Sequence, residues 1–272
     1  MATLPILGAA LDRASLADHI DWLREAPRDL ELQHFVDAEV LNGDWSGLAA
    51  EVNQLLDGHQ GRRGIHGPFW GFTISSYDPE VRRIVARRMD QALDVCAAVN
   101  GTHVVIHSPF STWGYNHRGL YPNDTERMLS ATRDTMGAAL KRAEDMGVTF
   151  VLENIEDIEP SDRAMLCEAL GWQALELSVD TGHAHYAHVS TGAPPVDFYI
   201  RAAGSRLGHI HLQDADGFAD RHWQIGHGTI LWQSVFGAIA QAGANPRLIL
   251  ELRDKAGVLP SAAYLKALGI AE

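Results

Sequence analysis

The segment GHIHLQDADGFADRHWQIGHG, residues 208–228, concentrates side chains that bind metal ions and exchange protons. It holds four of the 14 histidines of the chain, together with three aspartates. Imidazole and carboxylate ligands together suit Zn, Mn, Fe or Co better than Ca. The segment is a metal site, a basic patch that binds an anion, or a polar loop that is rich in histidine, and its surroundings must decide among these.

Residues of the same types recur along the chain, at the end of short apolar runs or in the loops that follow them. The nine candidate metal ligands are His66, His107, Glu153, Asp180, His183, His211, Asp220, His222 and Glu251. Most Asp and Glu residues lie on exposed helix faces, so this placement is unusual for surface charge. Buried carboxylates that share one site need cations or hydrogen bonds to compensate them. The pattern predicts a site for one to three divalent ions, with Zn, Mn or Co as candidates.

The apolar runs are short and β-rich, and each is followed by a longer amphipathic segment. Eight runs are predicted to be strands, at residues 4–9, 30–35, 63–66, 102–107, 148–154, 175–180, 207–212 and 247–252. The clearest helix lies at residues 78–99, after an Asp-Pro start, with an apolar stripe of Val81, Ile84, Val85, Met89, Leu93 and Cys96. This alternation predicts an α/β fold, a single (β/α)8 TIM barrel domain over residues 1–272. A doubly wound open sheet is the alternative.

The carboxyl ends of barrel strands carry the chemistry of such folds, and the candidate ligands fall at those ends. Side chains of a strand alternate between its two faces. In residues 247–252 the leucines share the face that packs on helices, so Glu251 is predicted to point into the barrel. In residues 148–154 the same alternation predicts that Glu153 points inward.

Several candidates also fit a purely structural role. His66 alone fits a hydrogen-bonded loop histidine, and Asp180 fits a helix cap. His209 shares a strand face with His211 and fits the layer behind that ligand, or the core. Four aromatic residues fit either the walls of a substrate site or core packing: Phe69, Trp70, Phe110 and Trp113.

Bulk composition narrows the classes of function. The net charge of −13 argues against a nucleic-acid partner, because binding to phosphates depends mostly on Lys and Arg. No apolar run approaches the roughly 18 residues of a membrane span, and the first residues lack the pattern of a signal peptide. Cys96 and Cys167 have no metal-type spacing and suit a reducing compartment. We expect a cytoplasmic enzyme with a small-molecule substrate and no membrane partner, as a monomer or a homo-oligomer.

Seven motifs span residues 65–253: IHGPF, VVIHSPF, VLENI, VDTGHA, HIHLQD, DRHWQIGHG and LELR. In combination they resemble the xylose isomerase-like TIM-barrel superfamily, which groups sugar isomerases and epimerases with the endonuclease IV type of DNA-repair enzyme (AP endonuclease family 2). The resemblance to ketose 3-epimerases implies one divalent ion bound by Glu153, Asp180, His211 and Glu251, and a substrate ligand at His183. It also implies that the two glutamates shuttle the proton. The resemblance to endonuclease IV implies three zinc ions bound by all nine candidates.

The sequence departs from both branches. The epimerases carry an arginine six residues after the metal-binding histidine, where this chain has Gly217. The repair-enzyme motifs HPGS and DTCH are replaced by HSPF and DTGH. The loops after the first two strands are short and poor in arginine, so they offer little to hold a bent duplex.

Two reactions of different classes fit these residues. The first is isomerisation or epimerisation of a small sugar, keto-sugar or sugar phosphate through a metal-stabilised enediolate, with Glu153 and Glu251 as acid and base. The alternative is a multinuclear, zinc-type phosphodiester hydrolase that acts on a small phosphodiester rather than DNA. A sugar-binding sensor is a third reading that uses the ligands poorly. The surrounding motifs favour the isomerase or epimerase, whereas the number of ligands favours the hydrolase.

Overall fold

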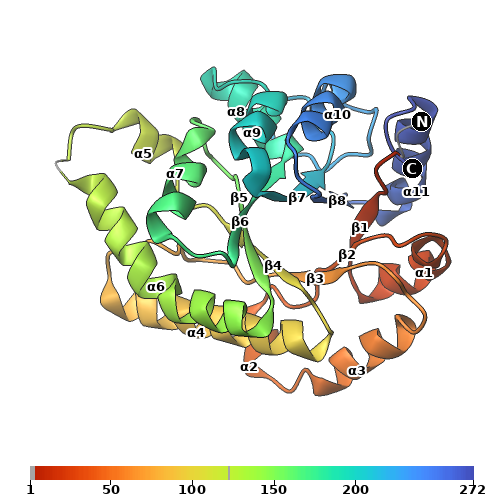
Figure 1. The fold of residues 1–272 in the computed structure, drawn as a ribbon, viewed down its shortest axis with the longest axis horizontal. Coiled ribbons are helices and arrows are strands. Elements are labelled where there is room, and N and C mark those ends of the chain that lie inside the picture. Colours follow the sequence, from red (N-terminus) through yellow and green to blue (C-terminus); the bar gives the residue numbers. More distant parts are fainter. Residues whose placement is uncertain (1–3, 122) are drawn as a thin grey trace.

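Eight parallel strands form a closed barrel in the computed structural model, which describes residues 4–121 and 123–272 (Figure 1). The strands are β1 (Gly8–Leu11), β2 (Leu30–Leu32), β3 (Arg63–His66), β4 (His103–His107), β5 (Thr149–Glu153), β6 (Leu175–Asp180), β7 (Leu207–Leu212) and β8 (Arg247–Leu250). They follow chain order around the barrel, and β1 pairs with β8 through Gly8–Ile249 and Ala9–Leu250. The predicted TIM barrel is confirmed, and the open sheet is excluded because the two outer strands pair.

The first strand was predicted too early in the chain. Residues 63–66, 175–180 and 207–212 form strands at the predicted bounds, but β1 begins at Gly8 and not at residue 4. Pro5 has no N–H to donate to a strand ladder. The N–H of Leu7 bonds the carbonyl of Glu272 instead, at 2.8 Å, and pairing with β2 and β8 starts only beyond it.

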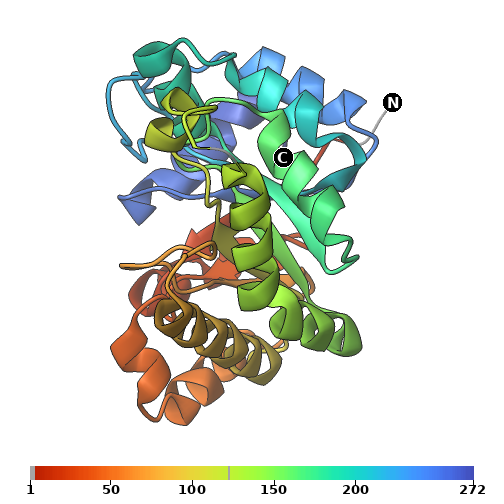
Figure 2. The same ribbon diagram turned by 90° about the vertical axis from the view of Figure 1, so that its left-hand side faces the viewer.

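Helices surround the barrel, and two views at right angles show them as an outer layer (Figures 1 and 2). They are α1 (Arg13–Arg24), α2 (Ala38–Asn42), α3 (Ser46–Leu55), α4 (Pro79–Ala98), α5 (Thr112–Asn116), α6 (Asp124–Met146), α7 (Ser161–Leu170), α8 (Thr181–Thr191), α9 (Val196–Ala203), α10 (Trp232–Gln241) and α11 (Val258–Ala267), with short 3-10 turns at Gly204–Arg206 and Lys255–Gly257. Within the described ranges, no helix combines the length and the apolar character needed to cross a membrane.

Helix α4 illustrates how the outer layer packs. Its first turn is capped by Asp78, whose side chain accepts a hydrogen bond from the N–H of Glu80 at 2.7 Å, and Val85 and Met89 are fully buried. Ile84 was placed on the same stripe, but it is 48% exposed. Successive helical residues are about 100° apart, so Ile84 falls outside the face centred on Val85. Helix α4 lies beside α6 (Figure 1), and the apolar core fills the space between helices and strands.

Candidate metal centre

All nine candidate ligands converge at the carboxyl end of the barrel and form three groups, two of which share Glu153. Within each group, one ligand atom per residue lies within 4.8 Å of the others. The first group is His66, His107 and Glu153; the central group is Glu153, Asp180, His211 and Glu251; the loop group is His183, Asp220 and His222. The alternation argument placed Glu153 and Glu251 correctly, since both contact His211 from inside the barrel.

In the first group, two imidazoles face one carboxylate oxygen. The Nε2 atoms of His66 and His107 lie 3.7 and 3.6 Å from Oε2 of Glu153, which has no hydrogen-bond partner among the described residues. The Nδ1 of His66 donates to the carbonyl of Gly67 at 2.9 Å, which leaves the lone pair on Nε2. Two ligands of a tetrahedral zinc ion are about 3.4 Å apart, given bonds of about 2.1 Å. The spacing therefore fits an ion between these three side chains.

The central group places three carboxylates around one histidine. Nδ1 of His211 lies 2.9 Å from Oε1 of Glu153 and 3.3 Å from Oε2 of Glu251. Asp180 is fully buried, and burial, together with the neighbouring Glu153 carboxylate, raises its pKa to about 6. Carboxylates gathered in such a site repel one another unless positive charge is supplied. The donor set fits a divalent cation.

In the loop group, two histidines face Asp220. Nε2 of His183 and Nε2 of His222 lie 3.5 and 3.0 Å from Oδ1 of Asp220. Both rings donate from Nδ1 to backbone carbonyls, of Asn154 at 2.9 Å and of Glu251 at 3.1 Å. Burial would lower the pKa of His222, but the bond to Asp220 and the Glu251 carboxylate raise it to about 9. Both rings of the loop group therefore turn Nε2 toward one oxygen of Asp220, as both rings of the first group turn Nε2 toward one oxygen of Glu153.

Local backbone structure positions these side chains. Asp180 ends β6 and caps α8, because its Oδ1 accepts from the N–H of His183 at 2.7 Å. Asp180 therefore caps the helix, as the sequence allowed, and also belongs to the central group. His222 adopts a left-handed backbone with φ of 50°, which is rare for a residue with a side chain and is common at functional sites.

Asp214 and Asp216 organise the loop that carries Asp220 and His222. Asp214 is buried and accepts from the N–H of Gly226 at 2.7 Å and from the indole of Trp232 at 3.2 Å. Asp216 pairs with Arg221 at 2.8 Å. Both aspartates therefore serve to hold the loop in shape.

Gln213, Gln33 and Lys255 lie near the groups and were not recognised in the sequence. Gln213 donates to Asp220 Oδ1 at 2.9 Å and to Asp180 Oδ1 at 3.2 Å, and so joins the central and loop groups. Gln33 donates to Oε1 of Glu251 at 2.5 Å and accepts from Lys255 at 2.9 Å. Gln213 follows β7 directly, and this adjacency was the one signal available for it.

The four aromatic candidates differ in their surroundings. Phe69 stacks on His107 with ring centroids 4.1 Å apart and also touches Trp70, which is 67% exposed. Phe110 packs against the apolar core, in keeping with its alternative role. Trp113 is exposed and stacks on His117 at 3.8 Å. Phe69 and Trp70 are thus the pair beside the first group.

Gly217 leaves no room for the arginine of the ketose 3-epimerases. Its φ is 80°, and a Cβ at this position would lie 2.3 Å from a methyl carbon of Val189. A side chain here would be strained and would clash. Any residue that holds a substrate in this chain must come from another position.

Comparison with known proteins gives one family and several relatives. The family described as "xylose isomerase-like TIM barrel" matches residues 28–268. An uncharacterised protein of Methanocaldococcus jannaschii, MJ1311, is 24% identical over 221 residues, which cover 78% of this chain and 72% of that protein. The D-psicose 3-epimerase of Ruminiclostridium cellulolyticum is 25% identical over 194 residues, covering 68% of this chain and 61% of that enzyme.

Solved structures agree on the fold. A protein of Thermus thermophilus, TTHB071, from crystals soaked with ZnCl2, is 25% identical and superimposes with a TM-score of 0.71, covering 96% of this chain and 97% of its own. Further neighbours, 15–20% identical, are a D-tagatose 3-epimerase-like protein, a D-psicose 3-epimerase and an L-ribulose 3-epimerase. Structural likeness at 15–20% sequence identity shows a shared fold and nothing further.

Proposed function

Because the chain belongs to the xylose isomerase-like TIM-barrel family, we propose that it is a divalent-metal-dependent isomerase or epimerase. Its substrate would be a small sugar, keto-sugar or sugar phosphate. The central group carries this proposal, because it brings two glutamates to the same nitrogen of His211, at 2.9 and 3.3 Å from Nδ1. The D-psicose 3-epimerase among its relatives supports the same reaction class.

The chain's own residues would hold the substrate carbon between two carboxylates. A divalent cation bound by the central group would supply the positive charge that stabilises an enediolate. Glu153 and Glu251 would remove a proton from one face of the carbon and return it on the other. Gln33 holds one oxygen of Glu251 at 2.5 Å, which leaves the other oxygen to face the reacting centre. His183 would contact a substrate hydroxyl, with Phe69 and Trp70 as a wall.

A second candidate, a multinuclear phosphodiester hydrolase, is favoured by the three separate groups. An isomerase of this kind needs only the central group. The ligand atoms of the first and loop groups nevertheless lie as close together as those of the central group, within 4.8 Å. The nine residues include four carboxylates, so one divalent ion leaves a net charge of −2 and three ions leave +2. Positive charge of that size suits a phosphodiester. The overall charge of −13 favours a small substrate over DNA.

Metal counting on the purified protein separates the two functions. The isomerase predicts about one tightly bound ion per chain, and the hydrolase predicts three. His222→Ala should remove an ion in the second case and leave a one-ion isomerase largely active. His117→Ala, which changes a histidine outside the three groups, is the matched control. Three zinc ions per chain would refute the one-ion mechanism.

Solvent exchange tests the chemistry directly. In D2O, the protein should place deuterium on the carbon next to the carbonyl of a keto-sugar or its phosphate, read by NMR over a panel of such sugars. Glu153→Gln should lower the exchange by at least about 100-fold, because it removes one member of the acid–base pair. Glu168→Gln, on the exposed surface of α7, should leave it unchanged. Hydrolysis of bis(p-nitrophenyl) phosphate without sugar exchange would favour the hydrolase.

A further inference from the structure

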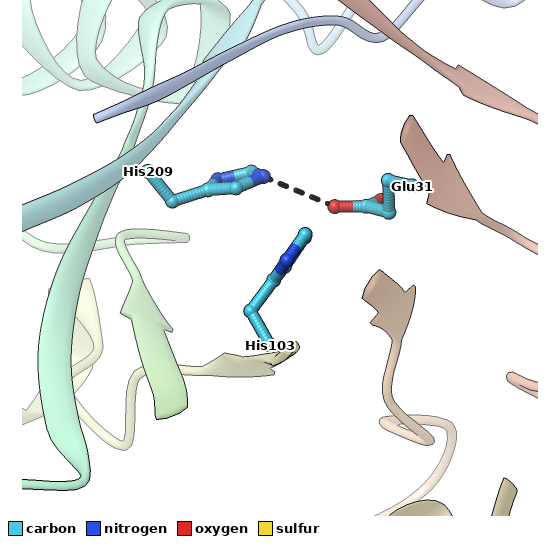
Figure 3. Close-up of side chains that lie close together, drawn as sticks. All are labelled: Glu31, His103 and His209. Atoms are coloured by element: carbon cyan, nitrogen blue, oxygen red, sulfur yellow. Dashed lines mark ion pairs between the residues drawn. The ribbon is translucent and has the colours of Figure 1, made fainter. Parts of the chain in front are cut away.

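Three side chains that the candidate metal centre does not use meet inside the barrel, below its rim (Figure 3). Glu31 comes from β2, His103 from β4 and His209 from β7, and all three are fully buried. Glu31 and His103 lie at one level of the sheet, because both pair with Gly64 of β3. Gly64 makes room for the His103 ring, since a Cβ there would lie 2.1 Å from it. We call Glu31, His103 and His209 the interior cluster.

Glu31 connects the interior cluster to the central group. Its Oε2 lies 3.2 Å from Nε2 of His209 and 3.0 Å from Nε2 of His211 (Figure 3 shows the first pair). The other nitrogen of His211, Nδ1, faces Glu153 and Glu251. One imidazole thus has its two nitrogens in different places, one against a buried carboxylate and one in the candidate metal site.

From this geometry we propose that Glu31 is the positioning residue of the metal centre. A neutral imidazole carries one proton, and a cation in the central group needs the lone pair of Nδ1. The proton of His211 must then sit on Nε2, where Glu31 accepts it. Carboxylates that accept the second N–H of a ligating histidine fix its tautomer and ring orientation and strengthen it as a ligand. The inference rests on the metal site of the proposed function.

His209 lies against Glu31 and is itself bonded to Ser178. Nδ1 of His209 is 2.9 Å from the hydroxyl of Ser178, and its Nε2 faces the same Glu31 oxygen that His211 uses. Glu31 also has an oxygen within 4.8 Å of ligand atoms of His66 and Glu251. The carboxylate is therefore directly behind the candidate ligands and is supported from the opposite side of the barrel.

A cation within the interior cluster is the competing explanation, because Glu31, His103 and His209 have a metal-compatible spacing and both ring nitrogens of His103 have no partner within residues 4–121 and 123–272. Two observations oppose it. Oε2 of Glu31 already faces two imidazoles, and Arg247 of β8, which is buried, pairs in register with His209. A guanidinium beside the cluster repels a second cation.

Metal affinity tests the proposal without reference to activity. Zn²⁺ or Co²⁺ binding is measured by competition with a chromophoric chelator, on wild type and on Glu31→Gln. The amide keeps the size of the side chain but can turn its NH2 toward His211, so the central ion should bind about 10–100-fold more weakly, with a changed Co²⁺ absorption spectrum. His103→Gln changes the same cluster without touching His211, and its metal affinity and stoichiometry should match wild type.

A second measurement needs no substitution. In the ¹⁵N spectrum of histidine side chains, zinc-loaded wild type should show His211 as the Nε2–H tautomer. Unchanged affinity in Glu31→Gln, or an Nδ1–H tautomer, would overturn the proposal. Loss of one ion in His103→Gln would also overturn it, in favour of an interior cation. Wild type that binds no divalent ion would overturn the metal site itself and the proposed function with it, so the two failures are distinguishable.

Discussion

At the residue scale, the candidate ligands are oriented by bonds that do not involve a metal. His66, His183 and His222 each use Nδ1 on a backbone carbonyl and turn Nε2 to a carboxylate. His211 uses the opposite nitrogen, because Glu31 takes its Nε2. Residue types and positions were predictable from the sequence, but the choice of nitrogen was not, since it depends on partners that are distant along the chain.

Proton release on metal binding follows from the pKa of His222. In the metal-free protein this pKa is raised to about 9, so the ring carries a proton at pH 7, and an ion in the loop group must displace it. Metal affinity should therefore fall as the pH decreases below about 9. Calorimetry in two buffers of different ionisation enthalpy counts the protons. When the loop group binds an ion, His222→Gln should release about one proton fewer than wild type. Equal proton release by the two proteins would mean that no ion occupies the loop group.

The raised pKa of His222 also affects the stability of the metal-free protein. A histidine whose folded-state pKa lies above its usual 6.5 stabilises the folded state fully below pH 6.5 and loses that contribution as the pH rises through about 9. The metal-free protein should therefore become less stable across this interval. Urea unfolding at pH 6 and pH 9, with His222→Gln for comparison, measures the difference.

At the element scale, alternation along each strand explains what the sequence could and could not reveal. It placed Glu153 and Glu251 inside the barrel, and it applies equally to Glu31, which stands between Leu30 and Leu32. The signal for Glu31 was thus present but was not used. Gln33 carried the same signal, because it lies two residues after Glu31 in the predicted strand 30–35. Gln213 carried no such signal, because it follows β7 in a loop where no alternation fixes the direction of a side chain.

The close approach of β3 and β4 gives a prediction about Gly64. In Gly64→Ala the new methyl group would occupy the place of the His103 ring, which should lower the free energy of unfolding by about 1–3 kcal/mol. Gly64→Ala should destabilise the His103→Ala variant less than it destabilises wild type, because His103→Ala removes the ring that the new methyl group would meet. Chemical denaturation of both single variants and the double variant gives the coupling energy. Additive effects would show that the two residues do not compete for space.

At the scale of the whole molecule, the barrel explains how residues spread over 186 positions meet in one place. Every candidate ligand from His66 to Glu251 lies near the end of one of β3–β8, or in the loop or helix that follows it, and parallel strands deliver those ends to one rim. Fold and rim were predictable because both follow from repetition along the chain. The number of ions was not, because it depends on distances between loops.

Metal removal should destabilise the whole barrel. The central group joins β5, β6, β7 and β8, so an ion bound there holds four strands and neutralises repelling carboxylates. A ligand that binds only the folded state at 100 times its Kd adds about 2.7 kcal/mol. Treatment with EDTA should lower Tm, and added Zn²⁺ or Mn²⁺ should restore it. An identical Tm before and after chelation would mean that no ion binds the folded protein.

During synthesis, the last strand, β8, completes both the barrel and the candidate metal centre. The first group is complete in sequence once β5 has left the ribosome, but Asp220 and His222 follow β7, and Glu251 arrives only with the last strand. β8 also closes the barrel against β1. A growing chain can therefore present the three ligands of the first group while the central and loop groups are still incomplete. Barrel closure and completion of the centre coincide, so the nascent chain has no full metal site to load before it has a fold to hold it.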